Sequence, residues 1–176
     1  MRVASDRGLE GITVRAVADA AGVTAPAMYW HFADREALVR DVVREIARAF
    51  KDRIFDAGEA STSEERLRQS LDAFRRFALE HPAYFDALFI RDARTSRGAI
   101  EPRGSILQLL IERVSDCMRD GTIRADNAES VAMTCVAMSQ GLVILYRRGR
   151  FTSEADFKAF YELSLERLIG GLRAVS

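Results

Sequence analysis

The residues best suited to chemistry lie near the N-terminus, where two aromatic side chains and a histidine follow a run of small residues. Tyr29, Trp30 and His31 end a segment of seven or eight residues that begins after a threonine. If this segment is a helix, all three side chains lie on the face opposite Met28. Aromatic residues on a solvent face lower solubility, so this face either packs on neighbouring helices of the same chain or lies against another molecule. Major-groove DNA fits, because small residues approach base edges and thymine methyl groups while tyrosine, histidine and arginine reach phosphates.

Two short helices joined by a glycine turn are expected to hold these residues. Thr13 can cap the first helix, with Arg15 and Asp19 pointing away from its apolar face. Gly22 tolerates a left-handed backbone and turns the chain within three or four residues, as a helix-turn-helix unit requires. The apolar face of the first helix consists of residues at helical spacing: Val14, Val17, Ala18 and Ala21.

The second short helix carries the candidate contact surface. Thr24 can cap it. Met28 and Phe32 are four residues apart and therefore share one face. We expect this face to pack on Val17 and Val23, which leaves the opposite face for a partner.

The motif residues follow one another in a recognisable order: Thr13, Ala21-Gly22-Val23, Tyr29-Trp30-His31-Phe32, Arg35 and Leu38. From about residue 8 to residue 43, this order closely resembles the heads of the tetracycline-repressor (TetR) family of bacterial regulators. The resemblance implies an all-α protein with a helix-turn-helix DNA-binding head at residues 1–44. Residues 45–176 would form a helical ligand-sensing and dimerisation domain. The implied function is a transcriptional repressor that a small ligand releases from a palindromic operator on double-stranded DNA.

The resemblance also implies which residues contact DNA. Ala25 and Ala27 have no hydrogen-bonding side chains, so direct base readout would be thin and would depend on Arg15 and on DNA shape. The expected contacts are Arg15 at the start of the first short helix; Thr24, Ala25, Pro26 and Ala27 near base edges; Trp30 against thymine methyl groups or sugars; and Tyr29, His31 and Arg35 at phosphates.

Two features weaken the DNA interpretation. Heads of this family begin with a further helix, and only MRVASDRG precedes Leu9, so we expect a truncated first helix that leaves Val17, Met28 and Phe32 partly uncovered. A late start codon, omitted residues or an incomplete head would each explain it. Lys and Arg total 26, as do Asp and Glu, so no broad positive field attracts DNA. The alternative function is therefore a helical dimer that binds a small molecule or a protein and no longer binds DNA.

The rest of the chain predicts helices only, because no strand-period alternation persists. Asp34 can cap a helix over residues 35–57 that ends at Gly58, and the spacing from Thr62 to Glu65 has the form of a capping box. His81 precedes a proline and marks a break. The remaining expectations are a short helix at 84–90, a loop at 91–104, a helix at 106–118 that stops near Gly121, a buried helix from a capping box at Asp126 and Glu129 through Tyr146, and a last helix at 153–174.

The last two helices are too apolar to be left without a partner. The resemblance implies that this partner is the same pair of helices in a second subunit, although packing within one subunit is also compatible with the periodicity. The last helix should carry one broad apolar face: Phe157, Phe160, Tyr161, Leu165, Leu168, Ile169 and Leu172.

A small-molecule site is expected in the body, lined by aromatic and methionine side chains. An effector there would be apolar or aromatic, and its identity is unknown. Such a stripe also forms ordinary core. The candidate pocket residues are Phe74, Phe77, Phe85, Phe89, Met118, Met133 and Met138, and Arg75, Arg76, Gln108 and Gln140 could add polar contacts.

Catalytic chemistry has no visible residues. We find no glycine-rich phosphate loop, no metal-ligand spacing and no Gly-x-Ser-x-Gly turn, so we expect no enzyme, no cofactor and no metal. Cys117 and Cys135 should be buried free thiols rather than a disulfide or a redox switch. We see no secretory leader, and residues 131–146 are expected to be too short to cross a membrane, which places the protein in the cytoplasm.

Overall fold

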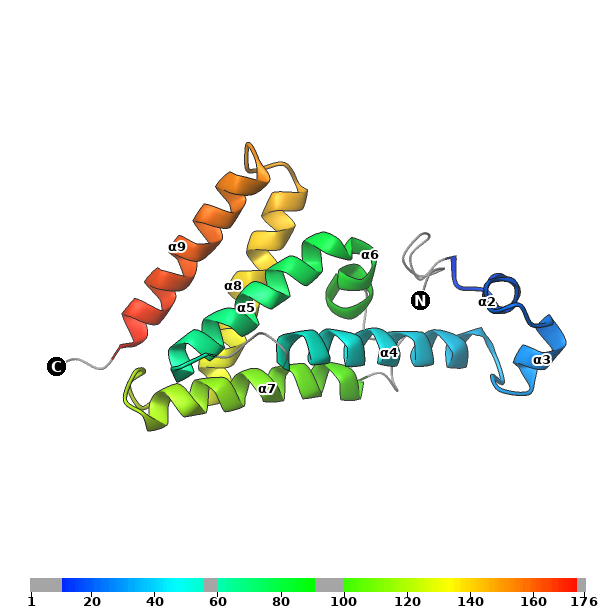
Figure 1. Cartoon of the computed structure of the whole chain (residues 1–176), viewed down its shortest axis with the longest axis horizontal. Coiled ribbons are helices and arrows are strands. Elements are labelled where there is room, and N and C mark those ends of the chain that lie inside the picture. Colours follow the sequence, from blue (N-terminus) through cyan, green and yellow to red (C-terminus); the bar gives the residue numbers. More distant parts are fainter. Residues whose placement is uncertain (1–10, 56–59, 91–99, 174–176) are drawn as a thin grey trace. The chain divides into compact units, whose positions relative to one another are not determined.

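The computed structural model of the chain describes residues 11–55, 60–90 and 100–173 (Figure 1). This part contains helices, a π-helical turn and loops, with no strand and one isolated bridge between Ile123 and Arg173. The predicted all-α fold is confirmed, while the expected truncation of the first helix falls on residues 1–10, outside the described part. The elements are α2 (Val14–Ala21), α3 (Ala25–Tyr29), α4 (Arg35–Phe55), α5 (Ser63–Glu80), α6 (Pro82–Phe85), the π-helical turn η2 (Asp86–Ile90), α7 (Ile100–Arg119), α8 (Ala128–Arg147) and α9 (Glu154–Leu172).

The described residues form two compact units. Unit 1 contains residues 11–52, 77–90 and 100–105, and unit 2 contains residues 53–55, 60–76 and 106–173. The boundaries between the units fall inside α4, α5 and α7. The division of the chain into a head and a body at residue 44 stays a prediction.

Unit 1 is built on the apolar stripe of α4. The rings of Phe50 and Phe77 stack with centroids 4.3 Å apart, and Phe89 meets Phe50 edge-on at 5.8 Å. Phe85 lies against Phe89 with ring centroids 5.3 Å apart. Aromatic pairs in these geometries add to the gain from burial. The buried members of this stripe in unit 1 are Leu38, Val43, Ile46, Ala47 and Phe50.

Three predicted helix boundaries are confirmed by their hydrogen bonds. The amide of Ala37 donates to Asp34 Oδ1 at 2.6 Å. The amide of Glu65 donates to Thr62 Oγ1 at 3.1 Å, and the amide of Thr62 donates back to Glu65 Oε2 at 3.2 Å, which completes the capping box. α5 ends one residue before His81, as the following proline requires. Gly58, predicted to end α4, lies outside the described residues.

Two boundaries differ from the prediction. α7 begins at Ile100, so residues 100–104 are helical and not loop, while residues 91–99 lie outside the described part. Pro102 is compatible with this because it falls in the first turn, where amides have no helical partner. The cap of α8 is Asn127 rather than Asp126: Asn127 Oδ1 accepts from the amide of Ser130 at 2.8 Å. Asp126 Oδ1 instead accepts from the amide of Asn127, so its predicted capping box does not form.

A buried tyrosine joins three helices of unit 2. The Tyr161 hydroxyl on α9 donates to the backbone carbonyl of Leu71 on α5 at 2.7 Å and lies 2.8 Å from Ser139 Oγ on α8. Tyr161 and Ser139 are fully buried. These bonds satisfy polar groups that would otherwise be costly inside the core.

α8 is less buried than predicted. Met133 is 47% exposed and Leu145 is 42% exposed. Of the most apolar 18-residue stretch of this helix, only 33% is buried inside the protein. α8 extends beyond the predicted residues 131–146 to Ala128–Arg147, and by length and composition alone it is the one helix of the described chain that could cross a membrane. A core helix passes the same test. The inner face of α8 packs on α9, to which a short turn connects it (Figure 1). Its other face carries Met133 and Leu145, which are exposed in the single chain.

Candidate nucleic-acid interface

α2 forms as predicted and presents one arginine to solvent. Thr13 Oγ1 accepts from the amide of Ala16 at 3.1 Å, which caps the helix. Gly22 ends it in the left-handed region at φ 68°, where a side chain would be strained. Arg15 lies exposed on the surface and forms no ion pair with a described residue. Ala21, expected on the buried face, is exposed because the helix ends there.

α3 is shorter than expected. It contains five residues, Ala25–Tyr29, and Trp30 is its C-cap. Thr24 occupies the N-cap position, but its side chain makes no capping hydrogen bond, so the predicted cap is wrong in that respect. Pro26 lies in the first turn, as expected. Met28 holds the helix to the rest of the head, with only 8% of its surface exposed.

The surface beyond α3 is aromatic and open. Trp30 is 90% exposed and Tyr29 is 60% exposed, and His31 is also exposed. Val23 was predicted to pack with Met28, yet it is 45% exposed because it lies in the turn between α2 and α3. Ala25 and Ala27 are half-buried. The residues of the expected contact face are therefore placed on one short element and its flanks, with their side chains available to a partner.

Arg35 is tied to the protein in a way that the sequence did not indicate. Its Nε donates to the backbone carbonyl of Ile12 at 2.8 Å, across 23 positions of the chain. Ile12 is completely buried just before α2. The arginine therefore links the start of α4 to the start of the helix-turn-helix segment, in addition to any contact with phosphate.

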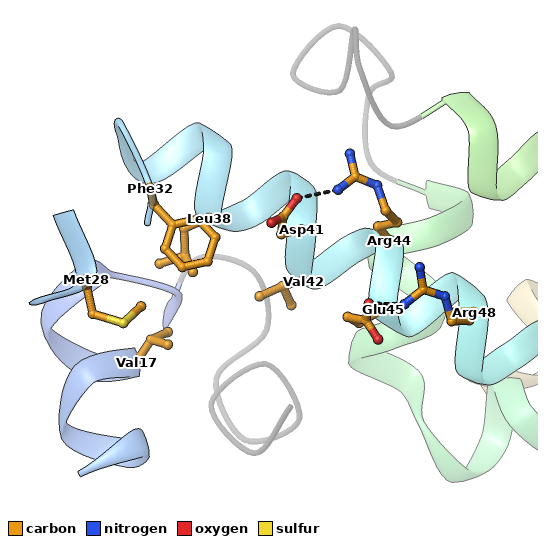
Figure 2. Close-up of a pocket in the computed structure, with 9 residues that line it drawn as sticks. All are labelled: Val17, Met28, Phe32, Leu38, Asp41, Val42, Arg44, Glu45 and Arg48. Carbon is orange, nitrogen blue, oxygen red and sulfur yellow. Dashed lines mark hydrogen bonds and ion pairs between the residues drawn. The ribbon is translucent and has the colours of Figure 1, made fainter. Parts of the chain in front are cut away.

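A cavity of about 380 Å³ lies between the helix-turn-helix segment and the first half of α4 (Figure 2). The three residues expected to be partly uncovered, Val17, Met28 and Phe32, all line it. Leu38 and Val42 of α4 complete its apolar wall, as Figure 2 shows. Its charged rim consists of the hydrogen-bonded pairs Asp41–Arg44 and Glu45–Arg48.

The charges at the start of α4 are largely neutralised. Arg44 and Arg48 pair with acids three residues earlier, and Arg40 lies 3.8 Å from Glu36. Exposed pairs of this kind add little stability. They do cancel positive charge that could otherwise attract DNA, so affinity would have to come from individual contacts such as Arg15.

The candidate ligand-pocket residues fall into both units. In unit 1, Phe77 and Phe89 both contact Phe50 of α4, and Phe85 contacts Phe89. Phe50 was not among the candidate pocket residues. In unit 2, Phe74 is buried, Met118 and Met138 are half-buried, and Met133 is 47% exposed.

The cysteines are free and buried, as predicted. Burial raises the pKa of Cys135 to about 11 and also raises the pKa of Cys117, so neither thiol ionises readily. Among the described residues, no group of three or more His, Cys, Asp or Glu side chains could hold a metal ion.

Two family models match the chain. Residues 67–168 match the tetracyclin repressor-like C-terminal domain, and residues 1–42 match the bacterial regulatory proteins of the tetR family. Relatives are found among known protein sequences. The uncharacterized HTH-type transcriptional regulator YobS of Bacillus subtilis is 22% identical to this chain over 173 residues, which cover 97% of this chain and 86% of YobS. The HTH-type transcriptional repressor KstR2 of Mycobacterium tuberculosis is 31% identical over 108 residues, which cover 59% of this chain and 51% of KstR2.

Solved structures share the fold. A protein of unknown function from Rhodococcus superposes with a TM-score of 0.85 at 21% identity, covering 98% of this chain and 91% of that one. The transcriptional regulator FadR from Bacillus subtilis, in complex with stearoyl-CoA, superposes with a TM-score of 0.76 at 19% identity, covering 98% and 95%. The ketosteroid transcriptional regulator KstR2 of Mycobacterium tuberculosis gives 0.68 at 21% identity, covering 99% and 91%.

Proposed function

The chain belongs to the TetR family of bacterial regulatory proteins, and we propose that it is a homodimeric repressor that leaves its operator when a small molecule binds the body. Members of this family are DNA-binding transcriptional regulators rather than enzymes. The proposal concerns how this chain contacts DNA, how it dimerises and what it senses. Because its target is chromosomal DNA, we also propose that it acts in the cytoplasm.

The observation that carries the DNA proposal is the exposure of Trp30. A tryptophan that is 90% exposed leaves a large apolar surface in water, next to a tyrosine that is 60% exposed. Met28, on the same short helix, is buried and holds these aromatic side chains outward. Partner-facing aromatic residues on a helix-turn-helix element fit the major groove, with Trp30 against thymine methyl groups or sugars and Tyr29 at a phosphate.

The other expected DNA contacts are kept as part of the proposal. They are Arg15, Thr24, Ala25, Pro26 and Ala27 toward base edges, and His31 and Arg35 toward phosphates. Two facing heads would then read a palindromic operator in successive major grooves, roughly 34–36 Å apart. The absence of a broad positive field means that both heads are needed for useful affinity.

Dimerisation is proposed through the outer surface of α8 and α9. Four large apolar side chains on these helices stay exposed in the single chain: Met133, Leu145, Phe160 and Leu163, at 41–47%. Their inner faces are already occupied, since Phe157, Tyr161, Leu165 and Ile169 are buried. A second copy would cover the outer face isologously, so the two pairs of helices would form a four-helix interface.

An apolar effector is proposed for the body. The candidate lining residues are Phe74, Phe77, Phe85, Phe89, Met118 and Met138. Met133, expected with them, is 47% exposed and is assigned to the outer face of α8 instead. Support for an apolar chain comes from FadR, whose structure was solved in complex with stearoyl-CoA. Binding would tilt α4 and change the spacing of the two heads. A ligand can shift that equilibrium only by binding the two arrangements with different affinity. A ligand-bound structure with unchanged head spacing would count against this mechanism.

The test is fluorescence anisotropy of the full chain on DNA from around its own gene, at two salt concentrations. The wild type is compared with the double variant Tyr29→Ala, Trp30→Ala and with Lys158→Ala, an exposed residue of α9. Selective, salt-sensitive binding that is lost only in the double variant supports the proposal. A folded dimer that does not bind DNA would favour the alternative, a helical dimer that binds only a small molecule or a protein.

A further inference from the structure

One arginine of α5 is buried next to a single carboxylate, which it shares with a second arginine. Arg75 is 5% exposed and is the one charged residue in the buried set of the described chain. Its Nε and Nη2 both donate to the same oxygen, Asp72 Oδ1, at 2.9 and 2.8 Å. Burying a guanidinium is costly unless its charge and its hydrogen bonds are matched.

The carboxylate of Asp72 is shared with a second arginine. Its other oxygen lies 3.1 Å from Arg76 Nε, whose side chain is 54% exposed. Two guanidinium groups and one carboxylate leave one net positive charge at this point of the helix. Arg75 Nη1 makes no hydrogen bond to a residue that the structure describes, and it is not one of the fully enclosed side-chain atoms without a partner, so it reaches solvent. An anion that arrives from outside can therefore accept from this donor.

The groups packed nearby do not supply the missing negative charge. Tyr161 is buried close enough for both Asp72 and Arg75 to influence its ionisation. Burial raises the pKa of Tyr161 far above its ordinary value, so its hydroxyl stays neutral and donates to Leu71. Burial likewise keeps the nearby Cys135 thiol protonated, because it raises that pKa to about 11. Leu71 and Phe74, which lie within four residues of Arg75 on α5, are buried apolar residues.

We propose that Arg75 binds the anionic group of the effector, so that the effector is an amphiphile with an apolar chain and a carboxylate or phosphate. This inference rests on the proposed function, because it concerns the ligand to which the body responds. An anion at Arg75 would complete the neutralisation that Asp72 provides only in part. Charge-assisted hydrogen bonds to a guanidinium are strong and favour planar or tetrahedral oxyanions.

The experiment is calorimetric titration of the full chain with decanoate and with decan-1-ol, which differ only in the charged group. For the wild type, decanoate should bind more tightly than decan-1-ol. Arg75→Gln should weaken decanoate by roughly 10- to 100-fold and leave decan-1-ol unchanged. Arg75→Lys keeps the charge but loses the planar guanidinium group. Its affinity for decanoate should therefore lie between those of the wild type and Arg75→Gln. Decyl phosphate in the same titration distinguishes a phosphate from a carboxylate.

Two further variants separate this role from a structural ion pair. Asp72→Asn removes the carboxylate that competes for Arg75, so decanoate should bind more tightly. If the Arg75–Asp72 pair were merely structural, Asp72→Asn and Arg75→Gln would weaken decanoate binding equally. Arg76→Gln is the matched comparison: it removes one positive charge from the same cluster but no buried donor, so it should weaken decanoate binding less than Arg75→Gln does. Far-UV circular dichroism checks that each variant is folded.

Several outcomes would overturn the inference. They are a wild type that binds neither ligand or does not prefer decanoate, an equal loss of both ligands in Arg75→Gln, and an equal effect of Arg76→Gln. Anisotropy on operator DNA is measured with the same preparations. Intact DNA binding beside any of these outcomes would leave the regulator proposal standing and reject only the role of Arg75.

Discussion

Arg35 Nε donates a 2.8 Å hydrogen bond to the backbone carbonyl of Ile12, which is completely buried. Arg35 is the first residue of α4, and Ile12 lies two residues before α2 begins. The bond therefore connects the two ends of the helix-turn-helix segment. A basic residue expected to contact phosphate also sets the position of the reading helix, so we treat it as a positioning residue.

Replacing Arg35 should separate these two roles. In Arg35→Ala, operator affinity should fall and the slope of log affinity against log salt should become smaller by about one, because the proposed phosphate contact is lost together with the positioning bond. A fall in affinity with an unchanged slope would reject the phosphate contact and leave the positioning role alone. Arg40→Ala is the control on the same helix, since its pair with Glu36 at 3.8 Å does not reach the segment before α2.

Trp30 and Met28 should behave in opposite ways when truncated. Trp30→Ala should change the free energy of unfolding by no more than about 0.5 kcal/mol, because the side chain is 90% exposed, yet it should weaken DNA binding. Met28→Ala should cost about 2–5 kcal/mol of stability, because it removes a buried side chain next to an existing cavity. Urea unfolding and anisotropy measure the two effects. A large loss of stability in Trp30→Ala would show that the indole ring packs within the protein and is not available to contact DNA.

The Tyr161 hydroxyl should contribute measurably to the free energy of unfolding, because it bonds two buried groups. Tyr161→Phe leaves the Leu71 carbonyl and the Ser139 hydroxyl without their shared partner, which should cost about 1–3 kcal/mol. Ser139→Ala removes only one of the two contacts and should cost less. The double variant should be less destabilised than the sum of the two single variants, because the residues are coupled. Additive losses would contradict a shared network.

Stability should decrease in acid through Glu64. Burial alone raises the pKa of this carboxyl, but hydrogen bonds and charge from Arg68 and Arg173 outweigh it and hold the pKa below the ordinary 4.5. A carboxyl with a lowered folded pKa contributes stability above its unfolded pKa, and this contribution is lost as the pH falls from about 4.5 through the folded pKa. The free energy of unfolding, measured with urea, should therefore decrease less steeply from pH 6 to pH 3 in Glu64→Gln than in the wild type.

The control for this pH effect is Glu162→Gln. Glu162 is 60% exposed and lies 3.8 Å from Lys158, so its loss should leave the acid dependence as it is in the wild type. An identical pH profile for wild type and Glu64→Gln would remove Glu64 from the explanation.

A charge on the outer face of α9 should prevent dimerisation. Leu163 is 44% exposed in the single chain, so Leu163→Arg should leave the monomer folded and place a charge in the proposed interface. Light scattering after gel filtration should show a dimer for the wild type and a monomer for Leu163→Arg, together with weaker DNA binding. Lys158→Glu provides a charge change on the same helix outside this apolar set. A dimer that tolerates Leu163→Arg would place the interface elsewhere.

Local features were predictable because the groups involved are neighbours in the chain. The Thr13 cap, the left-handed Gly22 turn and the capping box of Thr62 with Glu65 all depend on residues within five positions. Errors arose where two local solutions competed. Asn127 and Asp126 can both cap a helix, and the choice depends on which side chain reaches the amide of Ser130.

The sequence by itself determined the all-α class, most helix ends and the exposed aromatic end of α3, because residue type and period act over one or two turns. Tertiary structure decided which polar groups meet across long separations: Arg35 with Ile12 over 23 positions, Ser63 with Asp120 over 57, and Tyr161 with Leu71 over 90. It also decided that Arg75 is buried while Arg76 is exposed, although they are adjacent and chemically identical. No local pattern carries this information, since it depends on which neighbours the folded chain brings to each side of a helix.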